Sequence, residues 1–455
     1  MSVRFWAALW LAKLSRPLLR ITRHNGTDYP GRLALKVCPD FLHFIGKPAS
    51  ILAVTGTNGK TTACNIMCDM LEADGRQVLH NRLGSNTGSG ICTALLAGCT
   101  VLNRPRFDLA VLEVDERCSP LIFPHLKPDH ILITNLSRDS VPRNAHPQYI
   151  ADLMSACIPP ESRLILNGDD PVLMSVAPGN IRVYFGIERM QSEGSQVVNR
   201  CNDVQICPVC AGKLEYEFRR YHHIGRVRCT RCSFRSADCD YAASGVSFEN
   251  MTMTVSDKGG SGQYPLLVDN LFNTYDQTAA ITLLRELGYE HGRIASLMGS
   301  AKVPATRYQA QKVGNINLIM QMAKEKNAVA DSVVFDYISK QPGKKELLIM
   351  NSPIESLYQP ENVCWLYDCD FEFLARKGIE HIVVAGARAK DYRLRLLLAG
   401  VPDERIDCDP DALSAAEQLQ LIPGQTVYVL YGTAFLPLSC KVRDKIIRLI
   451  QEQMK

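Results

Sequence analysis

The sequence lacks long apolar runs, a strong excess of charge of one sign, and repeats or low-complexity tracts. Because no apolar run is long enough to cross a bilayer, we expect no membrane-spanning helix. The formal net charge of the 455 residues is only +4, which argues against a nucleic-acid-binding protein, since that class shows a much stronger basic excess. The start of the chain shows no cleavable signal, because its short apolar stretch is interrupted by Lys13 and Arg16.

The composition is that of a soluble globular protein, with 46% hydrophobic and 22% charged residues. The chain is too long for a single core, so two or three domains are expected. The 17 cysteines are an odd number, and many are scattered through apolar runs as small buried side chains would be. We therefore expect a cytoplasmic protein with reduced thiols, in which paired cysteines indicate a metal site rather than disulfides.

The first twenty residues form a basic amphipathic pattern typical of a helix. We expect three basic side chains on one face and four large apolar side chains on the other: Lys13, Arg16 and Arg20 against Phe5, Trp6, Leu9 and Trp10. Two interpretations fit this pattern. Either the helix packs on its own domain, or it forms a peripheral surface near lipid headgroups at the inner face of the membrane.

Strand-like and helical segments alternate along the chain, which predicts an α/β protein. The first half contains the strand-like runs "SILAVTG", "LAVLEVD", "HILITNL" and "RLILNGDD", and the second half contains "NINLIMQ", "ELLIMNS", "HIVVAGA" and "TVYVLYG". We expect an N-terminal segment at 1–47 packed on the next domain, a mostly parallel α/β domain at 48–303 with an insertion at about 201–240, and a second, Rossmann-like α/β domain at 304–455.

A glycine-rich loop, "GTNGKTT", lies where the first of these strands turns into a helix. Its residues are Gly56, Thr57, Asn58, Gly59, Lys60, Thr61 and Thr62. Glycines at such a turn let backbone N–H groups close on phosphate oxygens at the positive end of the helix dipole. Lys60 would then reach the β- and γ-phosphates of ATP, and the Thr61 hydroxyl would help to hold Mg²⁺. Ala53 stands where the longer Walker spacing has its first glycine, so the generic motif is incomplete.

Two Cys-x-x-Cys pairs, separated by 18 residues, have nearly the spacing of a zinc ribbon. Each pair forms a turn that directs two thiolates at one point, and the two turns together complete a tetrahedron: Cys207, Cys210, Cys229 and Cys232. Four protein ligands leave no open position, so the predicted zinc ion is structural rather than catalytic. Cys201 and Cys239 flank the module without such pairing and are expected to lie outside the site.

The loop sequence "TGTNGKTT" resembles the ATP loop of the Mur ligase superfamily, whose members activate a carboxylate as an acyl phosphate and couple it to an amine. Further segments resemble that superfamily in order: "LEVDE", "ITNLSRD", "LILNGDDP" and "LFNTYDQTAA". The resemblance implies a catalytic role for Lys60, Mg²⁺ binding by Glu113 together with Thr61, and nucleotide contacts by Asn167 and Asn273. For Glu113 taken alone, a solvated acid at a strand end is the alternative.

The four-cysteine insertion, together with "NVCWLYDCDFE" and "VVAGARAKDYRLRLLLAGV", resembles the MurT family, the synthetase subunits of lipid II isoglutaminyl synthase. This resemblance covers nearly the entire chain. It implies a heterodimer with a GatD-like glutamine amidotransferase subunit, whose ammonia amidates the D-glutamate α-carboxyl of the lipid II stem peptide to D-isoglutamine. The synthetase subunit of the family is thought to lend an aspartate to the Cys–His pair of the partner. Asp368 matches that position, and Asp370 is the second choice.

Three features depart from the family pattern. Ser140 begins an altered segment after "NLSRD", Asp276 replaces an asparagine on the adenine side, and Lys324 lies in a changed segment. The alternative functions are an amino-acid-adding ligase of the Mur or folylpolyglutamate type and a nucleic-acid-binding ATPase. The ribbon and "WLYDCDFE" argue against the first. The nucleic-acid-binding interpretation depends on a basic cluster in the ribbon that could contact phosphates: Arg219, Arg220, Arg226, Arg228 and Arg231. The same cluster could also face acidic lipid headgroups or form a solvated rim.

Overall fold

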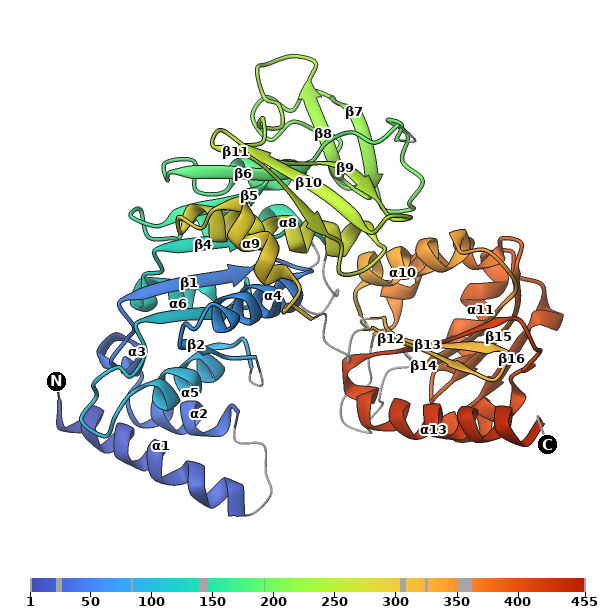
Figure 1. The fold of residues 1–455 in the computed structure, drawn as a ribbon, viewed down its shortest axis with the longest axis horizontal. Coiled ribbons are helices and arrows are strands. Elements are labelled where there is room, and N and C mark those ends of the chain that lie inside the picture. The colour runs from blue at the N-terminus through green and yellow to red at the C-terminus, as the bar shows by residue number, and fades with distance from the viewer. Residues whose placement is uncertain are drawn as a thin grey trace. The chain divides into compact units, whose positions relative to one another are not determined.

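The computed structural model describes residues 2–21, 27–82, 85–138, 146–191, 193–302, 308–323, 326–350 and 362–453. The chain divides into two compact units. The first comprises Met1–Leu136, Pro147–Gln196 and Val204–Val303, and the second comprises Ser137–His146, Val197–Asp203 and Pro304–Lys455. Each unit is built on its own sheet flanked by helices (Figure 1), which confirms the predicted α/β class.

The first unit contains a nine-stranded sheet in the order β11-β10-β9-β6-β5-β4-β1-β3-β2. The strands are β1 (Ser50–Thr55), β2 (Val78–His80), β3 (Leu109–Glu113), β4 (His130–Ile133), β5 (Arg163–Asn167), β6 (Arg182–Ile187), β9 (Tyr241–Ser247), β10 (Thr252–Asp257) and β11 (Gly260–Pro265). Pairing is parallel from β2 to β9, and β10 and β11 extend the sheet antiparallel. The central strands are apolar except at their ends, because helices cover both faces of a parallel sheet.

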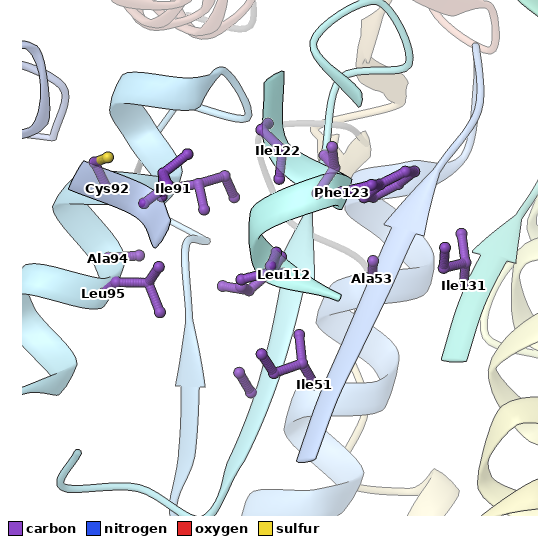
Figure 2. Packing of buried hydrophobic residues seen from close by; sticks show 14 of the residues in the cluster. Ile51, Ala53, Ile91, Cys92, Ala94, Leu95, Leu112, Ile122, Phe123 and Ile131 are labelled. Carbon is purple, nitrogen blue, oxygen red and sulfur yellow. The ribbon is translucent and has the colours of Figure 1, made fainter. Parts of the chain in front are cut away.

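Two hydrophobic clusters lie on opposite faces of this sheet. The alternation of side chains along β1 separates them, since Ile51 and Ala53 belong to one cluster and Leu52 and Val54 to the other. The first face is covered by α1 (Val3–Ile21), α2 (Tyr29–Val37), α3 (Phe41–Phe44), α5 (Gly88–Gly98), α6 (Ser119–Leu126) and α7 (Pro147–Ser155). Figure 2 shows part of this packing around Leu112 of β3. The second face is covered by α4 (Lys60–Ala73), α8 (Leu271–Glu286) and α9 (His291–Met298).

The N-terminal helix α1 does not divide its faces as the sequence predicts. Phe5 and Leu9 are fully buried in the first cluster, whereas Trp10 is exposed. The ammonium of Lys13 donates to the carbonyls of Leu96 and Cys99, 2.7 Å from each, at the end of α5. The prediction that the large apolar residues share one face is therefore wrong, because α1 has apolar side chains on both its buried and its exposed side.

A two-stranded hairpin, β7 (Leu214–Tyr221) and β8 (Ile224–Cys229), is inserted between β6 and β9 and carries the cysteine pairs. The second unit contains a six-stranded sheet in the order β12-β13-β17-β14-β15-β16, parallel except for β12. Its strands are β12 (Tyr308–Val313), β13 (Ile316–Met322), β14 (Lys345–Met350), β15 (Ile379–Ala385), β16 (Ile406–Asp409) and β17 (Thr426–Tyr431).

The described helices of the second unit are α10 (Ala328–Lys340), α11 (Ala389–Leu398), α12 (Ala412–Ala415) and α13 (Leu436–Gln453). Short 3₁₀ turns join them: η3 (Cys364–Tyr367), η4 (Phe371–Ala375), η5 (Asp403–Arg405), η6 (Ala416–Gln418) and η7 (Thr433–Phe435). Here too a separate hydrophobic cluster packs on each face of the sheet. Among the described helices of the whole chain, none is both long and apolar enough to cross a membrane.

Candidate active site

The carboxyl ends of β1, β3, β4 and β5 lie at one edge of the first sheet, because these neighbouring strands are parallel. Polar residues follow each strand end at this edge, where ligands bind in open parallel sheets. The glycine-rich loop after β1 leads directly into α4, a helix of 14 residues. The positive end of the helix dipole therefore faces the loop, as a phosphate site requires.

Two glycines give the loop its shape. Gly56 has a φ of 123° and Gly59 a φ of 88°, both in the left-handed region. A Cβ built on Gly56 would lie 2.4 Å from Oγ1 of Thr134, and one built on Gly59 would lie 2.0 Å from Oδ1 of Asp276. Both positions thus need glycine for backbone conformation and for space.

Residues after β4 support the loop from the sheet side. The backbone N–H of Thr57 donates to the carbonyl of Asn135 at 2.7 Å. The side chain of Asn135 pairs with the backbone of Asn58, accepting at 3.2 Å and donating at 3.0 Å. Behind it, the buried amide of Asn167 donates to the carbonyl of Thr134 at 3.1 Å. Asn167, predicted to contact nucleotide, is thus placed to hold the strand exit that carries the loop.

Lys60 is buried at the first position of α4. Its ammonium donates to Oε2 of Glu116 at 3.0 Å, to the carbonyl of Thr57 at 3.2 Å and to the carbonyl of Gly56. Burial alone would lower the pKa of Lys60, but the negative charges of Glu116 and Glu113 and the hydrogen bond to Glu116 raise it above its ordinary value. Lys60 therefore stays cationic at neutral pH, which suits the binding of phosphate.

Glu116 was not among the residues that sequence patterns indicate as functional. It closes the "LEVDE" segment and is buried, whereas a carboxylate at this place in the sequence is equally compatible with a solvated turn. A buried acid must be paired, and Lys60 is its partner. Only the packing of α4 against the end of β3 reveals this role.

Glu113 ends β3, and its Oε1 accepts a hydrogen bond from Nδ2 of Asn86 at 3.0 Å. The backbone of Glu113 is held by the side chain of Asn81, through bonds of 2.9 and 2.8 Å. Thr61 and Thr62 lie in the first turn of α4. Carboxylate and hydroxyl oxygens are the donors that Mg²⁺ prefers, so the Glu113 and Thr61 side chains fit that ion chemically.

The start of α8 lies against the loop. Asn270 caps this helix, and its Oδ1 accepts from the backbone N–H of Asn273 at 2.9 Å and from its Nδ2 at 2.8 Å. One turn further on, the carboxylate of Asp276 meets Gly59, as the built Cβ shows. The departure at Asp276 thus places an acid where the family pattern has an amide. The departures at Ser140 and Lys324 lie outside the described residues.

Asp169 connects the strand edge, the ribbon and α8. It is fully buried, and its carboxylate accepts from Arg220 at 2.6 Å, from Arg226 at 3.1 Å and from the Tyr275 hydroxyl at 2.7 Å. The side chain of Arg220 is itself fully buried and also pairs with Glu193 at 2.7 Å. The hairpin β7–β8 is therefore fixed to the sheet by ionic contacts that sequence spacing does not reveal.

This network corrects the interpretation of the ribbon arginines as one exposed basic cluster. Arg220 and Arg226 are committed to Asp169, and Arg228 pairs with Glu215 at 3.2 Å. The guanidinium of Arg219 stacks over the ring of Tyr216, 3.5 Å from its centroid. Most of the cluster is thus occupied within the chain, which removes the main observation in favour of a nucleic-acid-binding ATPase.

The two cysteine pairs converge on one point. The sulfur atoms of Cys207, Cys210, Cys229 and Cys232 all lie within 4.8 Å of one another, and the two closest pairs are separated by 3.4 and 3.6 Å. Four sulfurs around Zn²⁺ with bonds of about 2.3 Å would lie about 3.8 Å apart, so the cluster has the size of a tetrahedral zinc site. Within the described residues it is the one group of this kind.

Hydrogen bonds from the backbone also reach the sulfur atoms of this cluster. Backbone N–H groups point at two of them, from Val209 to Cys207 at 3.4 Å and from Arg231 to Cys229 at 3.3 Å. Desolvation opposes ionisation of Cys229, but the backbone N–H groups of Arg231 and Cys232 lower its pKa. For Cys232 the backbone N–H of Phe234 lowers the pKa, but burial and the hydrogen bonds with the other three thiols raise it. The convergence of four cysteine sulfurs on one point is therefore what fits zinc. Cys201 and Cys239 take no part in the cluster.

The second unit places Asp368 and Asp370 in different surroundings. Asp370 is 1% exposed, and its two oxygens accept from the Asn199 amide at 2.7 Å and the Arg200 backbone at 2.6 Å. The side chain of Asp368 is 30% exposed, and Nη1 of Arg138 donates to its Oδ2 at 2.9 Å. Asp370 therefore links its own segment to Asn199 and Arg200, whereas Asp368 presents its carboxylate at the surface.

Comparison with known proteins agrees with this architecture. Residues 325–435 match the family model described as MurT ligase C-terminal. The chain is 30% identical over 441 residues to the subunit MurT of lipid II isoglutaminyl synthase (glutamine-hydrolyzing) from Staphylococcus aureus strain COL, covering 96% of this chain and 97% of that one. The subunit of the same name from Streptococcus pneumoniae strain R6 is 26% identical over 386 residues, 84% of each chain.

Solved structures share the fold at low identity. A pseudomurein peptide ligase type C from Methanothermus fervidus superposes with a TM-score of 0.67 at 20% identity, over 90% of this chain and 81% of that one. MurF ligase from Thermotoga maritima, solved in complex with ADP, gives a TM-score of 0.59 at 15% identity, over 94% and 85% of the two chains. The fold is thus that of the Mur ligases. The sequence identity to the staphylococcal subunit, 30% over nearly the full length, is higher than the identity to either of these two structures. The chain belongs to the MurT family of Mur-ligase-like enzymes.

Proposed function

We propose that this chain is the ATP-dependent synthetase subunit of a glutamine-hydrolysing amidotransferase that acts on the peptidoglycan precursor lipid II. The observation that carries the proposal is the loop Gly56–Thr62 with its buried Lys60–Glu116 pair, in a chain whose relatives are named as that subunit. Its substrate would be the D-glutamate α-carboxyl of the stem peptide, and its product D-isoglutamine. The loop domain at 48–303 would bind ATP.

The loop supports transfer of the γ-phosphoryl group of ATP. Its backbone N–H groups and the start of α4 would hold the phosphates, and the protonated Lys60 would offset charge that develops on them. Mg²⁺, when held by Glu113 and Thr61, would neutralise further phosphate charge. A carboxylate oxygen of the substrate attacks the γ-phosphorus, the bond to ADP breaks, and an acyl phosphate forms. Asn135 and Asn167 position the loop for this step.

Amidation then uses ammonia as the nucleophile. The nitrogen attacks the acyl carbon, the carbon–oxygen bond to phosphate breaks, inorganic phosphate leaves with the electron pair, and the nitrogen loses a proton. No Cys–His pair of a glutaminase is recognisable in the sequence. We therefore infer that a GatD-like partner subunit hydrolyses glutamine to supply the ammonia, and that the C-terminal residues 304–455 contact it.

Asp368 is the residue proposed to complete the catalytic group of the partner. An aspartate that orients a histidine must be reachable from outside its own chain, and Asp368 is partly exposed whereas Asp370 is buried and doubly bonded. Arg138 is the positioning residue, because its guanidinium holds one oxygen of Asp368 and also pairs with Asp203. These contacts favour Asp368 over Asp370.

The zinc ribbon is proposed to be structural. Its four cysteines leave no open position on a tetrahedral ion, and its hairpin connects through Arg220 and Arg226 to Asp169, next to the strand exits that hold the loop. Zinc would thereby stabilise the nucleotide-binding edge of the sheet without taking part in the reaction.

The test is reconstitution with a GatD-like subunit, lipid II, ATP and either glutamine or ammonium chloride as nitrogen source. We expect D-isoglutamine from both sources with the wild-type chain. Asp368→Asn should abolish product from glutamine and retain product from ammonium, because only the glutaminase step needs it. Asp370→Asn is the contrast, and a selective loss of glutamine use in that variant would reassign the role. Product formed without ATP, or addition of an amino acid instead of ammonia, contradicts the proposed function.

A further inference from the structure

Helix α1 exposes a second apolar face that its own unit leaves uncovered. Its inner face packs Phe5 and Leu9 into the core. Its outer face carries Val3, Trp10, Leu11 and Leu14, which are 88%, 51%, 48% and 64% exposed. Val3, Trp10 and Leu14 are spaced by seven and four residues, which aligns them along one side of the helix.

The adjoining turn after α5 extends this surface. Val101 and Leu102 at its tip are also largely exposed, and the indole Nε1–H of Trp10 donates to the carbonyl of Val101 at 3.1 Å. Six of the eighteen large apolar side chains exposed in the described ranges thus belong to α1 and this turn. Figure 1 shows α1 at the periphery of the first unit, outside α2 and α5. We call this surface the α1 face: Val3, Trp10, Leu11, Leu14, Val101 and Leu102.

The charged side chains of helix α1 itself are all basic. Helix α1 contains four basic residues and no acid, and the first acidic residue of the chain is Asp28. Arg4 on the helix and Arg104 and Arg106 beyond the turn are exposed. The chain as a whole has a net charge of only +4, so this local excess is not a general property of the protein. Its complement is an anionic surface.

We propose that the α1 face binds the surface of a bilayer that contains anionic phospholipid. A helix with exposed Trp and Leu and with arginines but no acids is typical of helices that lie in the interface between headgroups and acyl chains. The indole of Trp10 suits that boundary, because one edge is apolar and the other carries a hydrogen-bonding group. The arginines would meet the phosphates of the headgroups while the apolar side chains insert between them.

This proposal stands on α1 and its turn, and it goes beyond the amidation chemistry. Membrane contact would place the enzyme on the surface where a lipid-linked substrate is located. No step of the proposed reaction depends on it, and it can be tested in the absence of substrate, nucleotide and partner. Its failure would leave the proposed function untouched.

The experiment measures co-sedimentation of the full chain with vesicles of phosphatidylglycerol and, separately, of phosphatidylcholine. We expect binding to the anionic vesicles, weakened by raising the salt concentration and much weaker on the zwitterionic ones. The double variant Leu11→Ser with Leu14→Ser should lower the apparent affinity about tenfold or more, since two partly exposed leucines lose their inserted surface. The matched control is Leu121→Ser with Ile181→Ser, two residues of the same unit that are 67% and 65% exposed, and it should bind as the wild type does.

Fluorescence gives a second readout that does not depend on folding of the double variant. The chain has three tryptophans, and Trp10 is the most exposed of them. Anionic vesicles should shift the emission of the wild-type chain to shorter wavelength, and Trp10→Phe should lose most of that shift. Equal sedimentation with both kinds of vesicle, none with the anionic kind, or an unchanged affinity in the double variant overturns the proposal. Self-association abolished by the double variant, without vesicle binding, would show that a second copy of the chain covers the face, and also overturns it.

Discussion

Replacing Gly59 with alanine tests whether the close approach of the loop to α8 governs nucleotide binding. Gly59 has a φ of 88°, and a Cβ there would lie 2.0 Å from Oδ1 of Asp276. Gly75, just beyond the other end of α4, has a φ of 84°, and nothing lies within 4 Å of its built Cβ. Gly75→Ala is therefore a matched control, because it carries the same backbone strain without the collision.

The cost of the left-handed backbone conformation and the cost of the collision with Asp276 can be separated. A left-handed alanine costs about 1–2 kcal/mol at either position. At Gly59 the collision adds about 1–3 kcal/mol, because the buried Asp276 carboxylate or the loop must move by about 1 Å or more to restore ordinary contact. We expect Gly59→Ala to lower the free energy of unfolding by about 2–5 kcal/mol and Gly75→Ala by about 1–2 kcal/mol. A loop displaced by about 1 Å should lose at least one hydrogen bond to a charged phosphate oxygen, which would weaken ATP binding about tenfold to a hundredfold.

Urea denaturation measures the difference in the free energy of unfolding, and isothermal titration with ATP measures the difference in ATP affinity. The titration is carried out at a temperature where both variants are folded by circular dichroism. We expect Gly75→Ala to bind ATP as the wild type does and Gly59→Ala to bind it far more weakly. Equal ATP affinity in the two variants would refute the assignment of this loop as the phosphate site, because the collision would then have no effect on the ligand.

The zinc cluster, the Asp169 network and a buried histidine each give a further prediction. Cys210→Ser should reduce bound zinc from about one ion per chain to almost none by metal analysis, whereas Cys440→Ser, at an exposed thiol, should retain it, and equal zinc in both contradicts the site. Asp169→Asn should lower the free energy of unfolding in urea by about 3–5 kcal/mol because Arg220 and Arg226 lose the buried carboxylate that they share, and an unchanged value contradicts the network. A hydrogen bond with Glu346, at 2.7 Å, raises the pKa of His381 against the effect of burial. The protonated imidazole therefore stabilises the fold at a pH below its unfolded-state pKa, and this stabilisation is lost as the pH rises through the folded-state pKa. His381→Asn should thus lower the free energy of unfolding more at about pH 5.5 than at about pH 8.5, and the reverse order contradicts the pairing.

Local patterns in the sequence were sufficient for the parts of the site that are local in the chain. The loop at Gly56–Thr62 was predictable because strand, glycine turn and helix follow one another directly, and each has its own residue pattern. The cysteine pairs were predictable because two residues between cysteines set a turn that directs both sulfurs to one side. Strands in the middle of both sheets were predictable because parallel strands buried on two faces are largely apolar. The named runs match β1, β3, β4 and β5 of the first sheet and β13, β14, β15 and β17 of the second, and the other strands were not among them.

Contacts between distant residues were not predictable. Glu116 pairs with Lys60 across 56 positions, and Arg220 reaches Asp169 across 51, so no spacing rule connects them. The same limit applies to α1, which has large apolar side chains on more than one side, so its amphipathic pattern does not show which of them are buried. Asp368 and Asp370 are only two residues apart, and they differ in burial and in hydrogen-bond partners, which the sequence does not show.

The most direct test of the account is amidation of lipid II by Lys60→Ala with saturating ATP and ammonium chloride, in the presence of the partner subunit. The exposed Lys344→Ala serves as the control, and zinc content and circular dichroism verify that both variants are folded. We expect a loss of D-isoglutamine formation of about a thousandfold in Lys60→Ala and none in the control. Formation of D-isoglutamine by Lys60→Ala at the wild-type rate would contradict the account.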